Sequence, residues 1–170
     1  MQARTHEVLF EGGIIQRGFW LYVWEVSPPL GTKLYYVGRT GDSSSTNAQS
    51  PFNRMGQHLG FAKNSNMLRR YLRQYDVEPE QCSFRLVALG PLERESKEVE
   101  RREHDQRRDV VAAMEKALAD LMEAAGYRVM NKVKCRKTLD AVRFAKVRRA
   151  FARAFHALAA PQSPAPRDKR

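Results

Sequence analysis

The chain has 170 residues, with a hydrophobic content of 42% and a charged content of 29%, which suits one compact soluble domain with an appendage. No apolar run approaches the roughly 18 residues that a membrane-spanning helix needs. Residues 1–13 lack the long apolar segment of a secretory signal, so we expect a cytoplasmic protein with no membrane partner.

The formal net charge of +11 is unevenly distributed. Residues 1–131 contain 18 Lys/Arg and 17 Asp/Glu, whereas residues 132–170 contain 12 Lys/Arg and 2 Asp/Glu. A nearly neutral body followed by a basic segment indicates a polyanionic partner, of which nucleic acid is the usual one. A solubilising tail, or a tail that binds an acidic protein, would show the same distribution.

The first elements in chain order form a predicted hairpin. Residues 19–26 are aromatic and β-branched, which is typical of a strand, and residues 27–32 have turn chemistry. Residues 33–38 predict a second short strand. The two strands should pair antiparallel, because their connection is too short for a parallel crossover.

Helices and a third strand should follow a polar, flexible loop at residues 41–49. Ser50 and Pro51 predict a helix start, and Arg54 and His58 then share one face of that helix. A second amphipathic helix is predicted from an apolar pattern whose exposed side carries three arginines. Residues 83–89 predict a strand that stops at Gly90-Pro91. The apolar residues of the second helix are Leu68, Tyr71, Leu72 and Tyr75, and its exposed arginines are Arg69, Arg70 and Arg73.

Residues 93–131 predict one long helix followed by a return strand or turn. Charged residues of both signs dominate up to Asp109 and indicate a solvated face, whereas an apolar helical pattern begins at Val111 and ends near Gly126. Glu115 falls among these apolar positions. A carboxylate there needs a partner, which a metal ion or a buried arginine could supply.

Thr138 should cap a last helix that reaches about Ala159, and the Pro-rich residues 161–170 should be disordered. The aromatic stripe of this helix would pack on the body or on a partner subunit. Its basic stripe would contact phosphates without choosing a sequence. We therefore divide the chain into a domain at 1–131 and a basic helical extension with a disordered tail at 132–170. The basic stripe consists of Arg143, Lys146, Arg149 and Arg153.

Five residues have the chemistry that phosphodiester hydrolysis requires. The reaction needs a group that orients or deprotonates water, a cation that stabilises the charged transition state, and a carboxylate for a divalent ion. They are Tyr22 and Tyr36 on the paired strands, Arg54 and His58 on the following helix, and Glu115 on the long helix.

The order of these residues resembles the GIY-YIG nuclease superfamily over residues 18–131, and this order is more specific than any one motif. Trp20 stands where the first signature has glycine, and both the gap between the tyrosines and the 41–50 loop are long. The matching segments are Trp20-Leu21-Tyr22, Tyr36-Val37-Gly38 with Arg39-Thr40-Gly41, Arg54 to Leu59, Met114-Glu115-Lys116 and Gly126 to Asn131.

The resemblance implies an α+β fold with a small antiparallel three-stranded sheet flanked by helices. It implies a tyrosine that orients or deprotonates water, helped by a nearby cation because the pKa of a free tyrosine is near 10. Arg54 would bind the scissile phosphate, His58 would bind the phosphate or the tyrosines, and Glu115 would hold Mg²⁺ or Mn²⁺. Arg39 and Asn131 would contact the nucleic acid.

The sequence thus predicts a metal-dependent DNA endonuclease. Each residue also has a simpler interpretation: the tyrosines and His58 could pack a core, the arginines could be solvated, Glu115 could pair with a structural Lys or Arg, and Asn131 could close a turn. A non-catalytic nucleic-acid-binding module on the same scaffold, which the altered first signature favours, and an interaction protein that docks an acidic partner are the alternatives. Cutting both strands would require a homodimer or two successive nicks.

Overall fold

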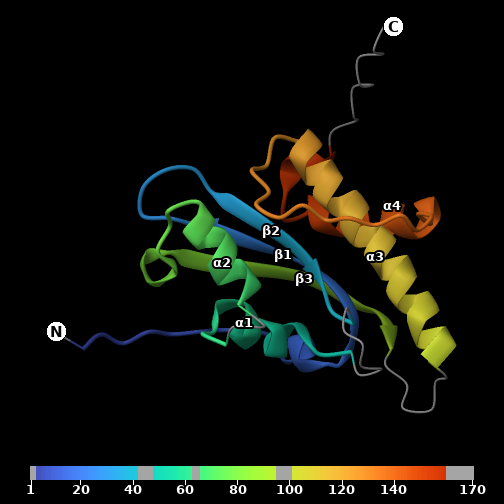
Figure 1. The fold of residues 1–170 in the computed structure, drawn as a ribbon, viewed down its shortest axis with the longest axis horizontal. Helices are drawn as coiled ribbons and strands as arrows, with labels where there is room; N and C mark the ends of the chain where they lie inside the picture. Colours follow the sequence, from blue (N-terminus) through green and yellow to red (C-terminus); the bar gives the residue numbers. More distant parts are fainter. Residues whose placement is uncertain (1–2, 42–47, 63–65, 95–100, 160–170) are drawn as a thin grey trace, which may run out of the picture.

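The computed structural model describes residues 3–41, 48–62, 66–94 and 101–159. In this part of the chain, a three-stranded antiparallel sheet of order β2-β1-β3 lies between two layers of helices (Figure 1). The strands are β1 (Gly18–Ser27), β2 (Leu34–Arg39) and β3 (Ser83–Arg94). The predicted mixed fold with a three-stranded antiparallel sheet is confirmed.

The predicted hairpin forms from β1 and β2, with Tyr22 opposite Gly38 and Trp24 opposite Tyr36. Successive side chains of a strand point to opposite faces of the sheet. Leu21 and Val23 therefore belong to one buried cluster, while Tyr22 and Trp24 belong to the other. Nearly all of β1 is buried, because β1 is the central strand and helices cover both of its faces.

The face that carries the tyrosines is covered by α1 (Pro51–Leu59) and α2 (Met67–Gln74). The predicted start of α1 is confirmed: the Ser50 hydroxyl accepts a hydrogen bond from the Asn53 amide at 3.2 Å, and Pro51 is the first helical residue. Leu68 and Leu72 of α2 complete the apolar cluster on this face.

The opposite face is covered by α3 (Arg101–Ala124) and α4 (Ala141–Ala152), which lie side by side in Figure 1. The apolar pattern predicted from Val111 onward is buried in this cluster. Gly126, with a φ of +86°, follows the end of α3 as expected of a helix C-terminus. Phe151 and Phe155, from the predicted extension, are buried in the same cluster as α3.

The predicted end of the third strand at Gly90-Pro91 is wrong, because β3 continues to Arg94 and Glu93 pairs with Phe19. An irregularity in the pairing opposite Trp20 accommodates the extra length. The ring of Trp20 occupies the space beside Gly90, where a Cβ would lie 2.6 Å from it. Residues 93–94 are therefore strand rather than helix, and 95–100 lie outside the described residues.

Two further predictions need correction. Arg69 is buried rather than solvated, since it donates to the Leu59 carbonyl at 2.9 Å and to Glu80 at 2.7 Å. The cap of α4 is Asp140 rather than Thr138, because the Asp140 carboxylate accepts from the Arg143 amide at 3.0 Å. This helix ends at Ala152 instead of reaching Ala159.

Short 3-10 helices complete the described fold, at η1 (Gly12–Ile15), η2 (Pro79–Gln81) and η3 (His156–Ala159). Most of the predicted flexible loop, at 42–47, and the predicted disordered tail lie outside the described residues. Across the described ranges, the helices are too short or too polar to cross a membrane.

Candidate functional site

Tyr22 and His58 form a buried hydrogen-bonded pair. Their elements bring them together across 36 residues of sequence: Tyr22 extends from the central strand and His58 from the last turn of α1. The Tyr22 hydroxyl lies 2.7 Å from His58 Nε2, and the two residues are 1% and 3% exposed. Such a pair holds one proton between a phenol oxygen and an imidazole nitrogen, whose roles depend on the histidine tautomer.

Gly38 makes room for this pair. A Cβ at this position would lie 2.5 Å from the Tyr22 ring, which is closer than two non-bonded carbon atoms can approach. The glycine of the YVG segment is therefore required by the neighbouring ring, because Tyr22 packs directly over the β2 backbone.

Tyr36 lies beside the pair, with its ring centroid 5.1 Å from that of His58 and 5.8 Å from that of Tyr71. Burial raises the pKa of Tyr36 far above its ordinary value, and the neighbouring Tyr22 and the negative charge of Glu115 raise it further. Arg54 acts in the opposite direction but does not outweigh burial. The Tyr36 phenol therefore stays neutral, because the help that the Arg54 cation gives to ionisation is smaller than the opposing effect of burial.

Arg54 lies half-buried on α1, and its guanidinium donates to Gln57 Oε1 at 3.0 Å. Gln57 in turn donates to Gln49 Oε1 at 2.8 Å. The sequence prediction missed both glutamines, although Gln57 lies three residues after Arg54, where side chains meet on a helix. This chain of amides orients the guanidinium, whose charge acts on Tyr36.

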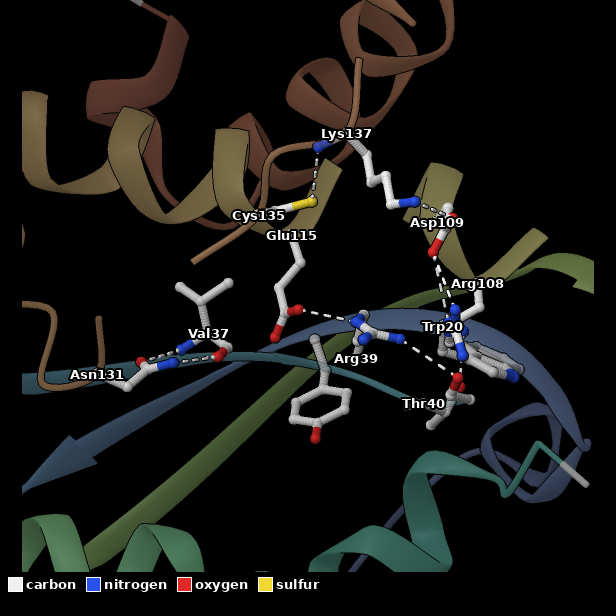
Figure 2. A network of polar contacts seen from close by, with 12 residues as sticks. Trp20, Val37, Arg39, Thr40, Arg108, Asp109, Glu115, Asn131, Cys135 and Lys137 are labelled. Atoms are coloured by element: carbon white, nitrogen blue, oxygen red, sulfur yellow. Dashed lines mark hydrogen bonds and ion pairs between the residues drawn. The ribbon is translucent and has the colours of Figure 1, made fainter. Parts of the chain in front are cut away.

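Glu115 reaches from α3 toward the sheet and pairs with Arg39 at the end of β2 (Figure 2). Arg39 Nε lies 2.9 Å from Glu115 Oε2, and the two side chains are 15% and 16% exposed. An arginine is one of the two partners that the sequence leaves open for this carboxylate, and Arg39 takes that place in the structure. The acid is directed into the molecule rather than into bulk solvent, close enough for its charge to act on Tyr36.

The donor set for a metal ion is small. Within the described ranges, no group of three or more His, Cys, Asp or Glu residues could hold a metal ion. Mg²⁺ is commonly held by one or two carboxylates, with substrate phosphates and water completing its shell. Glu115 fits such a site as a single protein ligand, provided that Arg39 gives up the oxygen with which it pairs.

Asn131 has a different role from the predicted contact with nucleic acid. It is buried, its amide oxygen accepts from the Val37 amide at 3.0 Å, and its amide nitrogen donates to the Val37 carbonyl at 2.7 Å (Figure 2). Both polar atoms of the side chain therefore bind β2, which carries Tyr36 and Arg39. The structure makes Asn131 a positioning residue for that strand.

Thr40 is a second positioning residue that the sequence prediction missed. Its hydroxyl donates to the Gly18 carbonyl at 2.6 Å and accepts from the Trp20 amide at 2.8 Å. These bonds join the end of β2 to the start of β1. The Thr that follows Arg39 in the YVGRTG segment is the only local signal for it.

The predicted basic stripe lies on α4 and its C-cap residue, Arg153, in the helix layer that also contains α3 (Figure 1). Lys146, Arg149 and Arg153 are exposed. Arg143 is also exposed, and it forms an ion pair with Glu93 of β3. Exposed ion pairs of this kind contribute little to stability, so Arg143 can exchange its partner for a phosphate at small cost.

Comparison of the chain with protein-family models, with curated proteins and with solved structures found no match.

Proposed function

We propose that this protein is a metal-dependent endonuclease that hydrolyses DNA phosphodiester bonds. The observation that carries the proposal is the buried Tyr22–His58 pair beside Tyr36, a phenol on which the charges of both Glu115 and Arg54 act. A buried phenol–imidazole pair beside a second buried phenol, with a carboxylate and a guanidinium near enough for their charges to act on that phenol, is an arrangement typical of functional sites.

The order of the elements supports the resemblance to the GIY-YIG nucleases. The chain forms a β1–β2 hairpin, two helices, β3 and then the long α3. The tyrosines lie on the two hairpin strands, the arginine and histidine on α1, and the glutamate on α3. This is the sequence of parts that the motifs predict.

Each side chain has a task in the proposed reaction. The guanidinium of Arg54 binds the scissile phosphate and stabilises the charge that develops on it. Tyr36, the more exposed of the two phenols at 8%, stays neutral and donates a hydrogen bond to a phosphate oxygen or orients the water. The Tyr22–His58 pair accepts the proton that the water loses.

Glu115 would hold the divalent ion. When bound, Mg²⁺ or Mn²⁺ supplies a Lewis acid for the phosphate oxygens and the leaving group. Positive charge for the transition state would then come from two elements, from Arg54 on α1 and from the ion that Glu115 on α3 would hold.

The test is nicking of supercoiled plasmid by the purified full chain with Mg²⁺, with Mn²⁺ and with EDTA. Nicking should require the ion, and Glu115→Gln and Arg54→Gln should abolish it. Asp120→Asn is the matched control, because it removes one negative charge from an exposed position of the same α3 helix. A wild-type protein that remains inert on plasmid with both ions and across a range of salt concentrations would show that the proposal is wrong.

A nucleic-acid-binding module without catalysis is the second candidate. It is favoured by the basic side chains of α4, which need neither Glu115 nor a metal ion in order to bind phosphates. DNA binding that is equally tight in EDTA and in Mg²⁺, without cleavage, would select this function over the first.

A further inference from the structure

The Arg39–Glu115 ion pair joins two residues with different partners in the proposed function. Glu115 is the single carboxylate for a divalent ion, and Arg39 is a predicted phosphate contact. The pair is close, at 2.9 Å, and both side chains are mostly buried, at 15% and 16% exposure. It therefore differs from an exposed ion pair, which water and salt would weaken.

While it is intact, the ion pair opposes both the binding of a divalent ion to Glu115 and the binding of a phosphate to Arg39. Arg39 Nε engages one oxygen of the carboxylate, and the guanidinium brings positive charge to the place where a cation would have to bind. Glu115 in turn neutralises the arginine that a phosphate would need. A divalent ion therefore competes with Arg39 for Glu115, and a DNA phosphate competes with Glu115 for Arg39.

Arg39 can exchange its partner. The further contact described for its guanidinium is a donation to the Gly41 carbonyl at 3.3 Å, near the upper limit for a hydrogen bond. A DNA phosphate offers two oxygens, which suits the planar guanidinium better than one carboxylate oxygen does. A phosphate at Arg39 would draw the guanidinium away from the Glu115 oxygen that it engages, and a divalent ion could then bind at that oxygen.

We propose that the Arg39–Glu115 pair makes DNA binding and metal binding depend on each other. The free protein binds divalent ions weakly, and a DNA phosphate that binds Arg39 makes the carboxylate oxygen engaged by Arg39 accessible to the ion. This inference rests on the proposed function, because it assigns regulation to the same site. Linkage requires DNA to strengthen metal binding by the same factor as the metal strengthens DNA binding. Because each residue of the pair competes with the other's ligand, neutralising Arg39 should strengthen metal binding and neutralising Glu115 should strengthen DNA binding.

The first measurement is Mn²⁺ binding to the full chain without DNA, followed by electron paramagnetic resonance of the free ion. Arg39→Gln should bind Mn²⁺ about fivefold or more tightly than wild type. Lys116→Gln is the matched control, since it removes the same charge next to Glu115 but from a lysine that pairs with Asp120 at 2.5 Å. Arg39→Gln combined with Glu115→Gln should lose the gain.

The second measurement is binding of a mixed-sequence DNA duplex in EDTA. Glu115→Gln frees Arg39 and should bind the duplex more tightly than Asp120→Asn, which makes the same change in net charge. Circular dichroism would reveal whether Arg39→Gln folds. If it does not, the comparison of duplex binding by Glu115→Gln and Asp120→Asn tests the inference without it.

Three results would overturn the inference: Mn²⁺ affinity of Arg39→Gln no higher than that of wild type, a gain that persists without Glu115, or equal duplex affinity of the two acidic-site variants. Neither measurement involves cleavage. An inert wild type whose Arg39→Gln variant gains Mn²⁺ affinity would refute the endonuclease alone, and an active enzyme without that gain would refute the coupling alone.

Discussion

Asn131→Ala should destabilise the protein more than a typical substitution of a polar residue. The amide of Asn131 makes two hydrogen bonds to the Val37 backbone, at 3.0 and 2.7 Å, in a buried position at the edge of β2. Alanine removes both and leaves the Val37 amide and carbonyl without these partners. Because β2 carries Tyr36 and Arg39, the strand that loses support is also part of the proposed site.

The magnitude follows from the two backbone groups that lose a partner. A buried donor or acceptor without a partner costs about 1–3 kcal/mol, so two of them cost roughly 2–6 kcal/mol. Water entering the space left by the amide would recover part of this at a sheet edge, which leaves roughly 2–4 kcal/mol. For a chain of this length, the melting temperature should fall by roughly 4–16 °C.

Urea unfolding followed by circular dichroism measures this free energy of unfolding directly. The midpoint should decrease while the slope stays that of wild type, because the surface exposed on unfolding is nearly unchanged. Asn53→Ala, at an exposed position of α1, is the control and should change stability little. A decrease of less than about 0.5 kcal/mol for Asn131→Ala would refute the reasoning, because surface substitutions have effects of that size.

Three other predictions follow from the described structure. Gly38→Ala should displace the Tyr22 ring, which a Cβ would approach to 2.5 Å, so we expect a decrease of about 1–3 kcal/mol in the free energy of unfolding together with loss of nicking; wild-type values for both would contradict this packing. The raised pKa of Tyr36 means that the unfolded phenol ionises near its ordinary value of 10.0 while the folded one does not, so stability is present below that pH and is lost above it. Tyr36→Phe should therefore lose less stability than wild type between pH 8 and pH 10.5, and equal decreases would argue against a neutral buried phenol. Replacing Lys146, Arg149 and Arg153 together by glutamine should reduce the slope of log affinity against log salt by about 0.9 for each phosphate that the variant no longer neutralises; an unchanged slope would exclude α4 from the DNA interface. This test is preferable to truncation after Asn131, because Phe151 and Phe155 belong to the core cluster.

Local sequence patterns were sufficient for most of the secondary structure. The aromatic and β-branched run of β1, the Ser50-Pro51 start of α1 and the apolar periodicity of α3 all predict elements that form. These signals work because a cap, a turn or a helical repeat depends on residues within a few positions of one another. The same reasoning failed at Gly90-Pro91, a pair of residues that usually ends a strand. Here β3 continues beyond it, because residues after the pair still bond to β1 and the ring of Trp20 packs beside Gly90.

Tertiary structure decided the partners of the polar side chains. Arg69 has the pattern of a solvated helix residue, but Leu59 and Glu80 provide it with hydrogen-bond acceptors. Glu115 and Arg39 are 76 residues apart, and Asn131 and Val37 are 94 apart. The sequence by itself determined which residue types were available for chemistry and on which elements they lie. It could not determine which charge neutralises which, because that depends on distances between elements, and these distances are set only when the sheet and both helix layers pack.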